Sequence, residues 1–172
     1  MTPTQATPTP VTPVLLSTAT PLPVTPTLAF TATPSPTPMT GVVAGPGTYD
    51  DNSTALIQVQ GTWEPIESAN GYGGRYLYSA DPNAELSVQF LGSGVAVQYV
   101  GYRNFGIFEL LIDGVLYQEV DAYAAGGTFG LSVFIQGLSR SVVHTLTIRN
   151  TGRANPASTG AVLAVDAITV LE

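Results

Sequence analysis

The chain has no cysteine, no lysine and a single histidine in 172 residues. Without cysteine, a disulfide framework, a thiolate metal site and a thiol nucleophile are all excluded. With one histidine as well, zinc and redox-metal sites are excluded. The five cations are all arginines and stand against 12 acidic residues, giving a net charge of −7. This balance argues against nucleic acid and against an anionic membrane surface as partners.

Long apolar runs are also missing, and none approaches the roughly 18 residues of a membrane helix. The start, Met1-Thr-Pro-Thr-Gln, lacks a basic region followed by an apolar one. We therefore expect either that a signal peptide has been removed or that the chain is a fragment.

Residues 1–40 hold 10 of the 14 prolines and 13 threonines, and no charge. Such composition predicts an extended tail that carries O-glycans on threonines, with Thr25, Thr33 and Thr37 as candidates. Two seven-residue windows, 14–20 and 27–33, are free of proline. In the second, the side chains alternate as in a β-strand.

Residues 41–48 form a Gly/Pro joint, and the globular domain is expected from 49 to 172. No window shows sustained helical periodicity, whereas β-type runs recur between Gly, Asp, Asn and Pro. These runs predict strands at 55–60, 75–79, 84–90, 94–100, 107–112, 115–120, 128–136, 142–149 and 161–170. About nine short strands indicate an all-β fold, a two-sheet antiparallel sandwich or jelly roll.

The clearest local signal is Asp113-Gly114, which separates two β-rich runs. A type I′ turn needs positive φ at both central residues, so this dipeptide predicts a tight hairpin over 107–120. Just before it, Tyr102, Arg103, Asn104 and Phe105 lie between glycines. Aromatic faces beside a guanidinium and an amide make this loop the first candidate for carbohydrate binding. Tyr72, Tyr76 and Tyr123 are weaker candidates, with turn or core-edge packing as the alternative.

Several short motifs follow one another in an order that resembles a known module. They are Trp63, Gly71-Tyr-Gly-Gly-Arg-Tyr-Leu-Tyr-Ser79, Gly92-Ser-Gly-Val95, Ile112-Asp-Gly114, Val120-Asp121, Gly137-Leu138, His144-Thr-Leu-Thr-Ile148 and Asp166-Ala167. Over residues 49–171 the chain resembles bacterial extracellular jelly rolls of the galactose-binding-like superfamily, similar to family 6 and family 35 carbohydrate-binding modules. The resemblance implies a jelly-roll fold and a non-catalytic module carried behind a Thr/Pro linker. It also implies an extracellular or cell-surface location.

The same resemblance implies a structural calcium where the first and last strands meet. Asp50, Asp51 and Asp166 are the carboxylates placed to hold it. The N-terminal glutamate pair expected of such modules is missing from this chain. Asn52-Ser53-Thr54 is the one N-glycosylation sequon.

Catalytic arrangements are weakly supported. The sequence has no Gly-x-Ser-x-Gly nucleophile elbow with which His144 could form a catalytic triad. We expect His144 to begin a strand. Glu109 and Glu119 flank the hairpin as a possible glycosidase pair, but isolated acids on the polar face of a strand explain them as well. We therefore expect no enzyme activity.

Two functions remain open. In the first, which the sequence slightly favours, the chain is a structural subunit of an extracellular fibre, a homopolymer in which each tail inserts into neighbouring domains. Val14, Leu16, Leu28 and Phe30 would be the buried assembly residues. In the second, the domain is a carbohydrate-binding module on a glycosylated stalk, and its partners are glycans.

Overall fold

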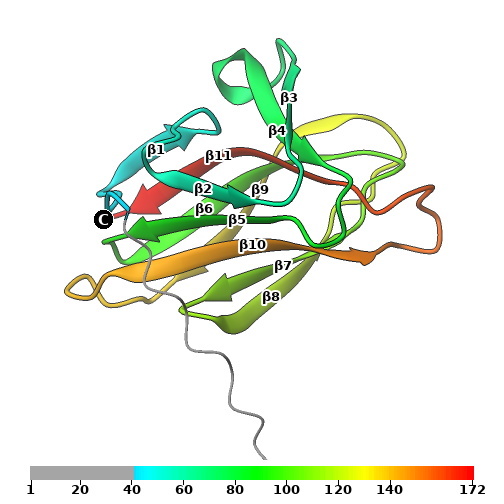
Figure 1. Ribbon diagram of the computed structural model, residues 1–172. Helices are drawn as coiled ribbons and strands as arrows, with labels where there is room; N and C mark the ends of the chain where they lie inside the picture. Colours follow the sequence, from blue (N-terminus) through cyan, green and yellow to red (C-terminus); the bar gives the residue numbers. More distant parts are fainter. Residues whose placement is uncertain (1–40) are drawn as a thin grey trace, which may run out of the picture. The chain divides into compact units, whose positions relative to one another are not determined.

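A computed structural model of the chain describes residues 41–172, which form two antiparallel β-sheets packed face to face (Figure 1). The strands are β1 (Gly47–Asp50), β2 (Ile57–Gln60), β3 (Glu64–Glu67), β4 (Arg75–Ser79), β5 (Glu85–Phe90), β6 (Gly94–Gly101), β7 (Ile107–Ile112), β8 (Val115–Asp121), β9 (Thr128–Gln136), β10 (His144–Arg153) and β11 (Leu163–Leu171). One 3₁₀ turn, η1 (Tyr72–Gly74), joins β3 to β4. The predicted all-β two-sheet sandwich is confirmed.

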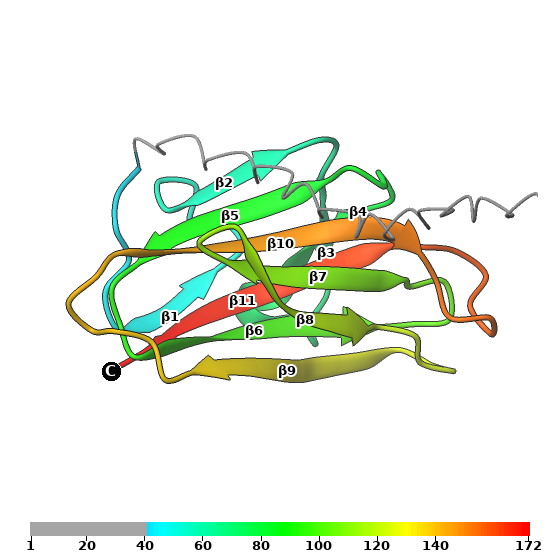
Figure 2. The ribbon, with the colours of Figure 1, turned by 90° about the horizontal axis from the view of Figure 1, so that it is seen from below.

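Sheet A has the strand order β2-β5-β10-β7-β8. Sheet B has the order β3-β4-β11-β6-β9, with β1 also paired to β11. Seen from below, the two layers run nearly parallel, and the loops after β6, β8 and β10 gather at the end away from the C-terminus (Figure 2).

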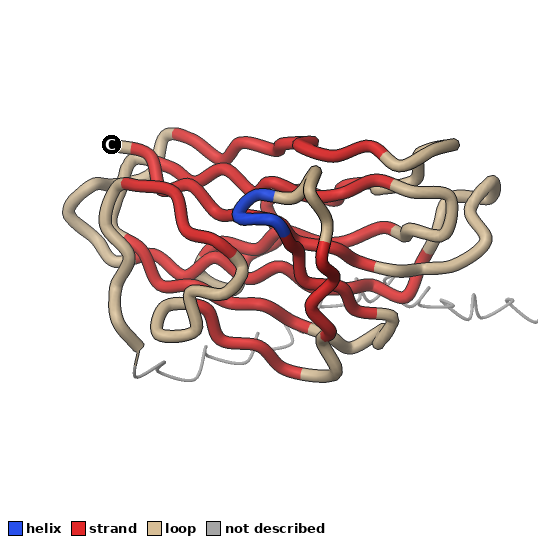
Figure 3. Tube along the Cα trace, turned by 90° about the horizontal axis from the view of Figure 1, so that it is seen from above, coloured by secondary structure: helices blue, strands red, loops and turns tan. Residues whose placement is uncertain are grey.

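The structure has two strands more than the nine predicted, β1 and β3. Each is only four residues long. Pro65 lies inside β3, and proline in a short run argues against a central strand. β3 is in fact an edge strand, where a missing N–H donor is tolerated. In Figure 3 the η1 turn (blue) lies at the β3–β4 connection, and β1 and β4 both pair with β11.

The core lies between the sheets and follows the two-residue period of the strands. In β5, Leu86, Val88 and Phe90 are buried, while the residues between them are half-exposed. Leu146 and Ile148 of β10 are fully buried opposite them. Apolar burial on this scale stabilises a sandwich that has no cysteine for disulfides.

The Asp113-Gly114 turn forms as predicted. Both residues have positive φ, 53° and 80° respectively, and they connect β7 to β8. The Asp113 carboxylate also binds β10, because Oδ1 accepts a hydrogen bond from the Thr145 N–H (2.8 Å) and Oδ2 lies 2.8 Å from His144 Nδ1. His144 is the first residue of β10, as expected.

The sandwich begins earlier than residue 49. Ala44 is buried beside Phe90: its N–H donates to Gln89 O (2.8 Å) and its carbonyl accepts from the Leu91 N–H (2.9 Å). β1 begins at Gly47. The second half of the predicted Gly/Pro joint is therefore part of the fold. No helix in the part of the chain that the structure describes is long and apolar enough to cross a membrane.

Candidate carbohydrate-binding pocket

A pocket of about 390 Å³ opens where β4, β6 and β9 meet the loops at the far end of the sandwich. Its lining is mostly aromatic and contains no charged side chain. The lining residues are Tyr76, Tyr78, Val100, Tyr102, Asn104, Phe105, Gly127 and Phe129. The volume suits a ligand of one or two sugar rings, at the small end of ligand pockets in general.

The aromatic rings of the lining hold one another in place. Tyr76 packs edge-on against Phe129, with ring centroids 6.0 Å apart. Phe105 packs in the same way against both Tyr78 and Tyr102, at 6.3 Å in each case. Such edge-to-face contacts fix ring orientation, so the pocket walls are organised before any ligand arrives.

Backbone hydrogen bonds from two other loops hold the segment that carries Tyr102. The Tyr102 N–H donates to Ala122 O, and its carbonyl accepts from the Ala124 N–H, both at 3.2 Å. The Thr159 N–H donates to Arg103 O (2.9 Å) and the Val162 N–H to Asn104 O (3.1 Å). A loop with its backbone groups paired in this way is a rigid support for a binding site.

Gly106 makes this loop packing possible. A Cβ atom at Gly106 would lie 2.6 Å from Arg153 O and 2.7 Å from Ala161 Cα. Both contacts are with backbone, so neither can move aside cheaply. The glycine therefore allows the loop of residues 102–105 to approach the β10–β11 connection.

The polar side chains of the pocket are three tyrosines and one asparagine. Burial raises the pKa of Tyr76 above its usual 10, with smaller contributions from Tyr78 and Asp166, so its phenol stays a hydrogen-bond donor at neutral pH. Asn104 Oδ1 is buried with no hydrogen-bond partner. An unpaired buried acceptor costs free energy that a ligand N–H or O–H would recover.

Three of the four predicted binding residues, Tyr102, Asn104 and Phe105, line this pocket together. Tyr102 is 36% exposed, whereas Phe105 is only 3% exposed and forms part of the core as well. The fourth residue, Arg103, places its guanidinium carbon 5.0 Å from the centre of the Tyr102 ring. The pocket assignment does not extend to Tyr72 or Tyr123, which are outside the lining.

Sequence reasoning gave Tyr76 little weight and missed four lining residues altogether: Tyr78, Val100, Gly127 and Phe129. These come from β4, β6, the β8–β9 loop and β9. The alternating aromatics of Tyr76-Leu77-Tyr78 were the one signal in the sequence that two rings share a face.

The three aspartates predicted for calcium lie near one another but have other partners. Both carboxylate oxygens of Asp51 accept hydrogen bonds from the Arg75 guanidinium, at 3.1 Å. Asp166 accepts from the Tyr72 N–H (2.8 Å) and from Gln98 Nε2 (3.2 Å).

Within residues 41–172, no three His, Asp or Glu side chains come together as metal ligands. The Asp51 carboxylate, which a bound cation would need as a ligand, is instead paired with Arg75. These contacts do not fit a calcium site, which stays a prediction without support from the geometry.

The remaining predicted sites are placed as follows. Glu109 and Glu119 face each other across β7 and β8, and both form ion pairs with Arg153. Asn52 is exposed, and its Nδ2 donates to Asp50 Oδ2 (2.9 Å). The tail residues, predicted for assembly or O-glycosylation, lie outside the described residues: Val14, Leu16, Leu28, Phe30, Thr25, Thr33 and Thr37.

No family model matches the chain. Among curated proteins, an A type blood N-acetyl-alpha-D-galactosamine deacetylase of Flavonifractor plautii is 32% identical over 101 residues, which is 58% of this chain. The chain spans only 13% of the length of that relative.

Solved structures share the fold at low sequence identity. A Paenibacillus xanthan lyase matches with a TM-score of 0.58 and 19% identity, over 78% of this chain and 14% of the lyase. CsCBM6-3 from Clostridium stercorarium, solved in complex with cellobiose, matches with a TM-score of 0.51 and 13% identity, over 77% of this chain and 98% of the module. An exo-beta-1,3-galactanase from Phanerochaete chrysosporium, bound to beta-1,3-galactotriose, matches with a TM-score of 0.52 and 16% identity, over 74% of this chain and 29% of the enzyme. The described residues therefore form a β-sandwich domain structurally similar to CBM6 and to modules of carbohydrate-active enzymes.

Proposed function

We propose that this domain is a non-catalytic carbohydrate-binding module and that its ligand occupies the aromatic pocket. The observation that carries the proposal is the pocket itself. Aromatic rings and one amide line it together, and the loop that carries part of this lining is held by backbone hydrogen bonds. Sugar rings present apolar C–H faces that pack on aromatic rings, while their hydroxyls need a few fixed polar partners. Tyr102 offers an aromatic ring for this packing, and Asn104 offers a polar partner for a hydroxyl.

The similar proteins support a glycan ligand without identifying the sugar. Two of the similar structures hold cellobiose or galactotriose, and the curated relative acts on an N-acetylgalactosamine. This chain corresponds to 13–14% of the deacetylase and the lyase, the share expected of an accessory domain. An accessory role in glycan breakdown would place the protein outside the cell.

The candidate catalytic groups have structural partners. Glu109 and Glu119 are neutralised by arginines, and both His144 ring nitrogens contact acceptors, Asp113 Oδ2 and Ser139 O. A glycosidase pair needs one free carboxylate and one protonated acid beside the substrate. These contacts favour binding without catalysis.

The fibre hypothesis rests on tail residues that the structure does not describe, and the comparisons give no evidence for assembly. The similarity to modules of carbohydrate-active enzymes favours the binding module instead. Assembly by tail insertion stays a prediction with its own test.

The proposal is tested by calorimetry and glycan arrays with two matched variants. Tyr102→Ala should weaken binding by about tenfold, the loss expected for an aromatic contact surface. Tyr117→Ala removes an equally large ring that is 50% exposed on β8, and it should leave binding unchanged. Equal losses in both variants, or binding that persists in Tyr102→Ala, would place the ligand elsewhere.

A further inference from the structure

The chain has five arginines and no lysine, and three of the arginines are paired with carboxylates. Arg75 binds Asp51, Arg149 binds Glu85 and Glu109, and Arg153 binds Glu109 and Glu119. In residues 41–172, no ion pair involves Arg103 or Arg140. An acidic domain thus leaves one unpaired guanidinium on the loop that builds its pocket.

The position of Arg103 is fixed although its donors are free. Its carbonyl accepts hydrogen bonds from the Thr159 N–H (2.9 Å) and from Ser158 Oγ (3.1 Å), so the backbone cannot swing away. The guanidinium lies against the Tyr102 ring, 5.0 Å from its centre. Among the described residues, its N–H groups donate no hydrogen bond. Stacking on a ring orients the planar fork while leaving its N–H edges available.

From this placement we propose that the pocket takes a sugar bearing an anionic group, with Arg103 binding the anion while the ring packs in the pocket. This inference rests on the proposed carbohydrate-binding function and names its ligand class. A guanidinium binds carboxylate or sulfate oxygens through two parallel N–H donors. The pocket lining is neutral and does not include Arg103, whose guanidinium instead stacks on Tyr102, a lining residue. A ligand whose ring packs against Tyr102 would therefore direct its charged group towards Arg103.

The net charge restricts the ligand further. A domain with 12 acidic and five basic side chains repels a polyanion at long range. At physiological salt, this repulsion is screened beyond about 8 Å, so it acts on those charges of a polyanion that lie close to the protein surface. The ligand is therefore a single acidic sugar at a chain end or among neutral sugars, and a uniformly charged polysaccharide is disfavoured.

The test compares sugars that differ in charge, using the full chain and isothermal calorimetry. Glucuronic and galacturonic acids are measured against glucose and galactose, and galactose 6-sulfate is the third arm. At low salt, an acidic sugar should bind about tenfold to a hundredfold more tightly than its neutral parent, the gain expected for a charge-assisted hydrogen bond. Added NaCl should reduce this preference. A preference for the sulfate over the carboxylates identifies a sulfate ester as the source of the charge.

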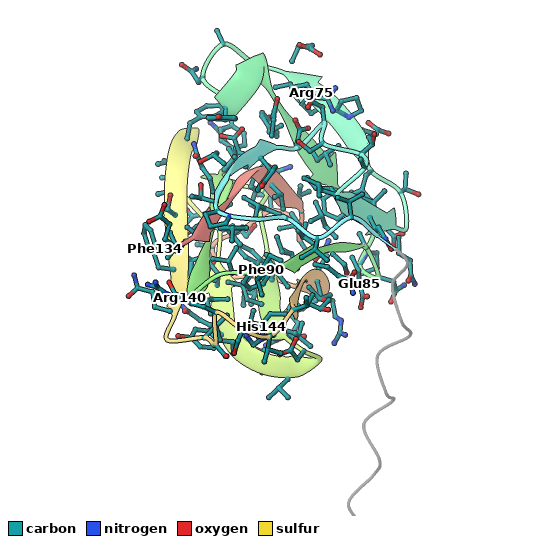
Figure 4. The ribbon with its side chains drawn as sticks, turned by 90° about the vertical axis from the view of Figure 1, so that its left-hand side faces the viewer. Arg75, Glu85, Phe90, Phe134, Arg140 and His144 are labelled. Atoms are coloured by element: carbon teal, nitrogen blue, oxygen red, sulfur yellow. The ribbon has the colours of Figure 1, made fainter. Side chains whose placement is uncertain are left out.

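Matched variants separate a local contact from a general charge effect. Arg103→Gln should abolish the preference, so that the acidic sugar and its neutral parent bind with similar affinity, while the melting temperature stays unchanged. Arg140→Gln removes the same charge from the β9–β10 loop (Figure 4) and should preserve the preference. Arg103→Lys, which keeps the charge but loses the fork, should retain only part of it.

Failures of the two proposals are distinguishable. If neutral sugars bind as tightly as acidic ones, or if Arg140→Gln lowers the preference as much as Arg103→Gln, the anionic ligand is refuted and the binding module stands. If no sugar in a broad glycan array binds the wild-type chain, the proposed function falls with it.

Discussion

Asp51 shows how burial and ion pairing compete at a single residue. Burial raises the pKa of Asp51 from 3.8 to about 6, although hydrogen bonds from Arg75 act in the opposite direction. The pKa of Arg75 is raised by the same hydrogen bonds, so the contact favours the arginine's charge. We take removal of the Asp51 carboxylate from water as the larger effect, since buried ion pairs often fail to repay their desolvation.

This raised pKa gives a signed prediction for stability. Between pH about 4 and about 6, folded Asp51 keeps a proton that the unfolded chain releases. Its contribution to the free energy of unfolding is therefore fully present below about pH 4 and is lost as pH rises towards 6. Burial also raises the pKa of Asp166, which contributes with the same sign.

Asp51→Asn removes this titration while preserving side-chain shape. Denaturant unfolding from pH 4 to 7 should show wild type losing stability relative to the variant as pH rises, with a constant difference above about pH 6. A difference that instead grows in favour of wild type would mean that Arg75 lowers the pKa below its ordinary value.

At the scale of elements, the β7–β8 hairpin is the part of the fold that local sequence determines most directly. Gly114 has a φ of 80°, and a Cβ atom there would meet nothing within 4 Å. A substitution is therefore penalised by backbone conformation alone.

Gly114→Val should lower the free energy of unfolding by more than about 1 kcal/mol, because an L-residue in the left-handed region is strained. Gly126→Val is the matched control, since a Cβ atom at Gly126 also meets nothing and φ there lies outside the left-handed region. Equal denaturation midpoints for the two variants would show that the turn relaxes to another type.

Element by element, the sequence predicted the long strands and missed two four-residue ones, β1 and β3. β5 alternates clearly and was predicted to within one residue, whereas β10, predicted at 142–149, continues to Arg153. β1 has only four residues in a glycine-rich stretch, and its strand geometry depends on β11, more than 100 residues later. The pocket shows the same limit: Tyr102 to Phe105 are contiguous, but Phe129 joins them only because β9 pairs with β6.

At the scale of the whole molecule, we expect a monomeric binding protein. Purified full-length chain should sediment as a monomer and show no filaments by electron microscopy. Filaments that disappear in Phe30→Asp, with the domain still folded by circular dichroism, would contradict this expectation. They would support assembly through the tail, because burial of Leu28 and Phe30 should contribute roughly 1.5 to 3 kcal/mol each.

The central claim is that carbohydrate binds in the aromatic pocket, and NMR mapping of the full chain tests it most directly. Titration with an oligosaccharide found by array should shift the amide signals of Tyr76, Tyr102, Asn104 and Phe129, four lining residues from three separate segments. Signals from the opposite end, such as Val142 and Val143 on the β9–β10 loop, should stay in place. Shifts confined to the outer strands of sheet A, with the pocket signals unmoved, would contradict the account.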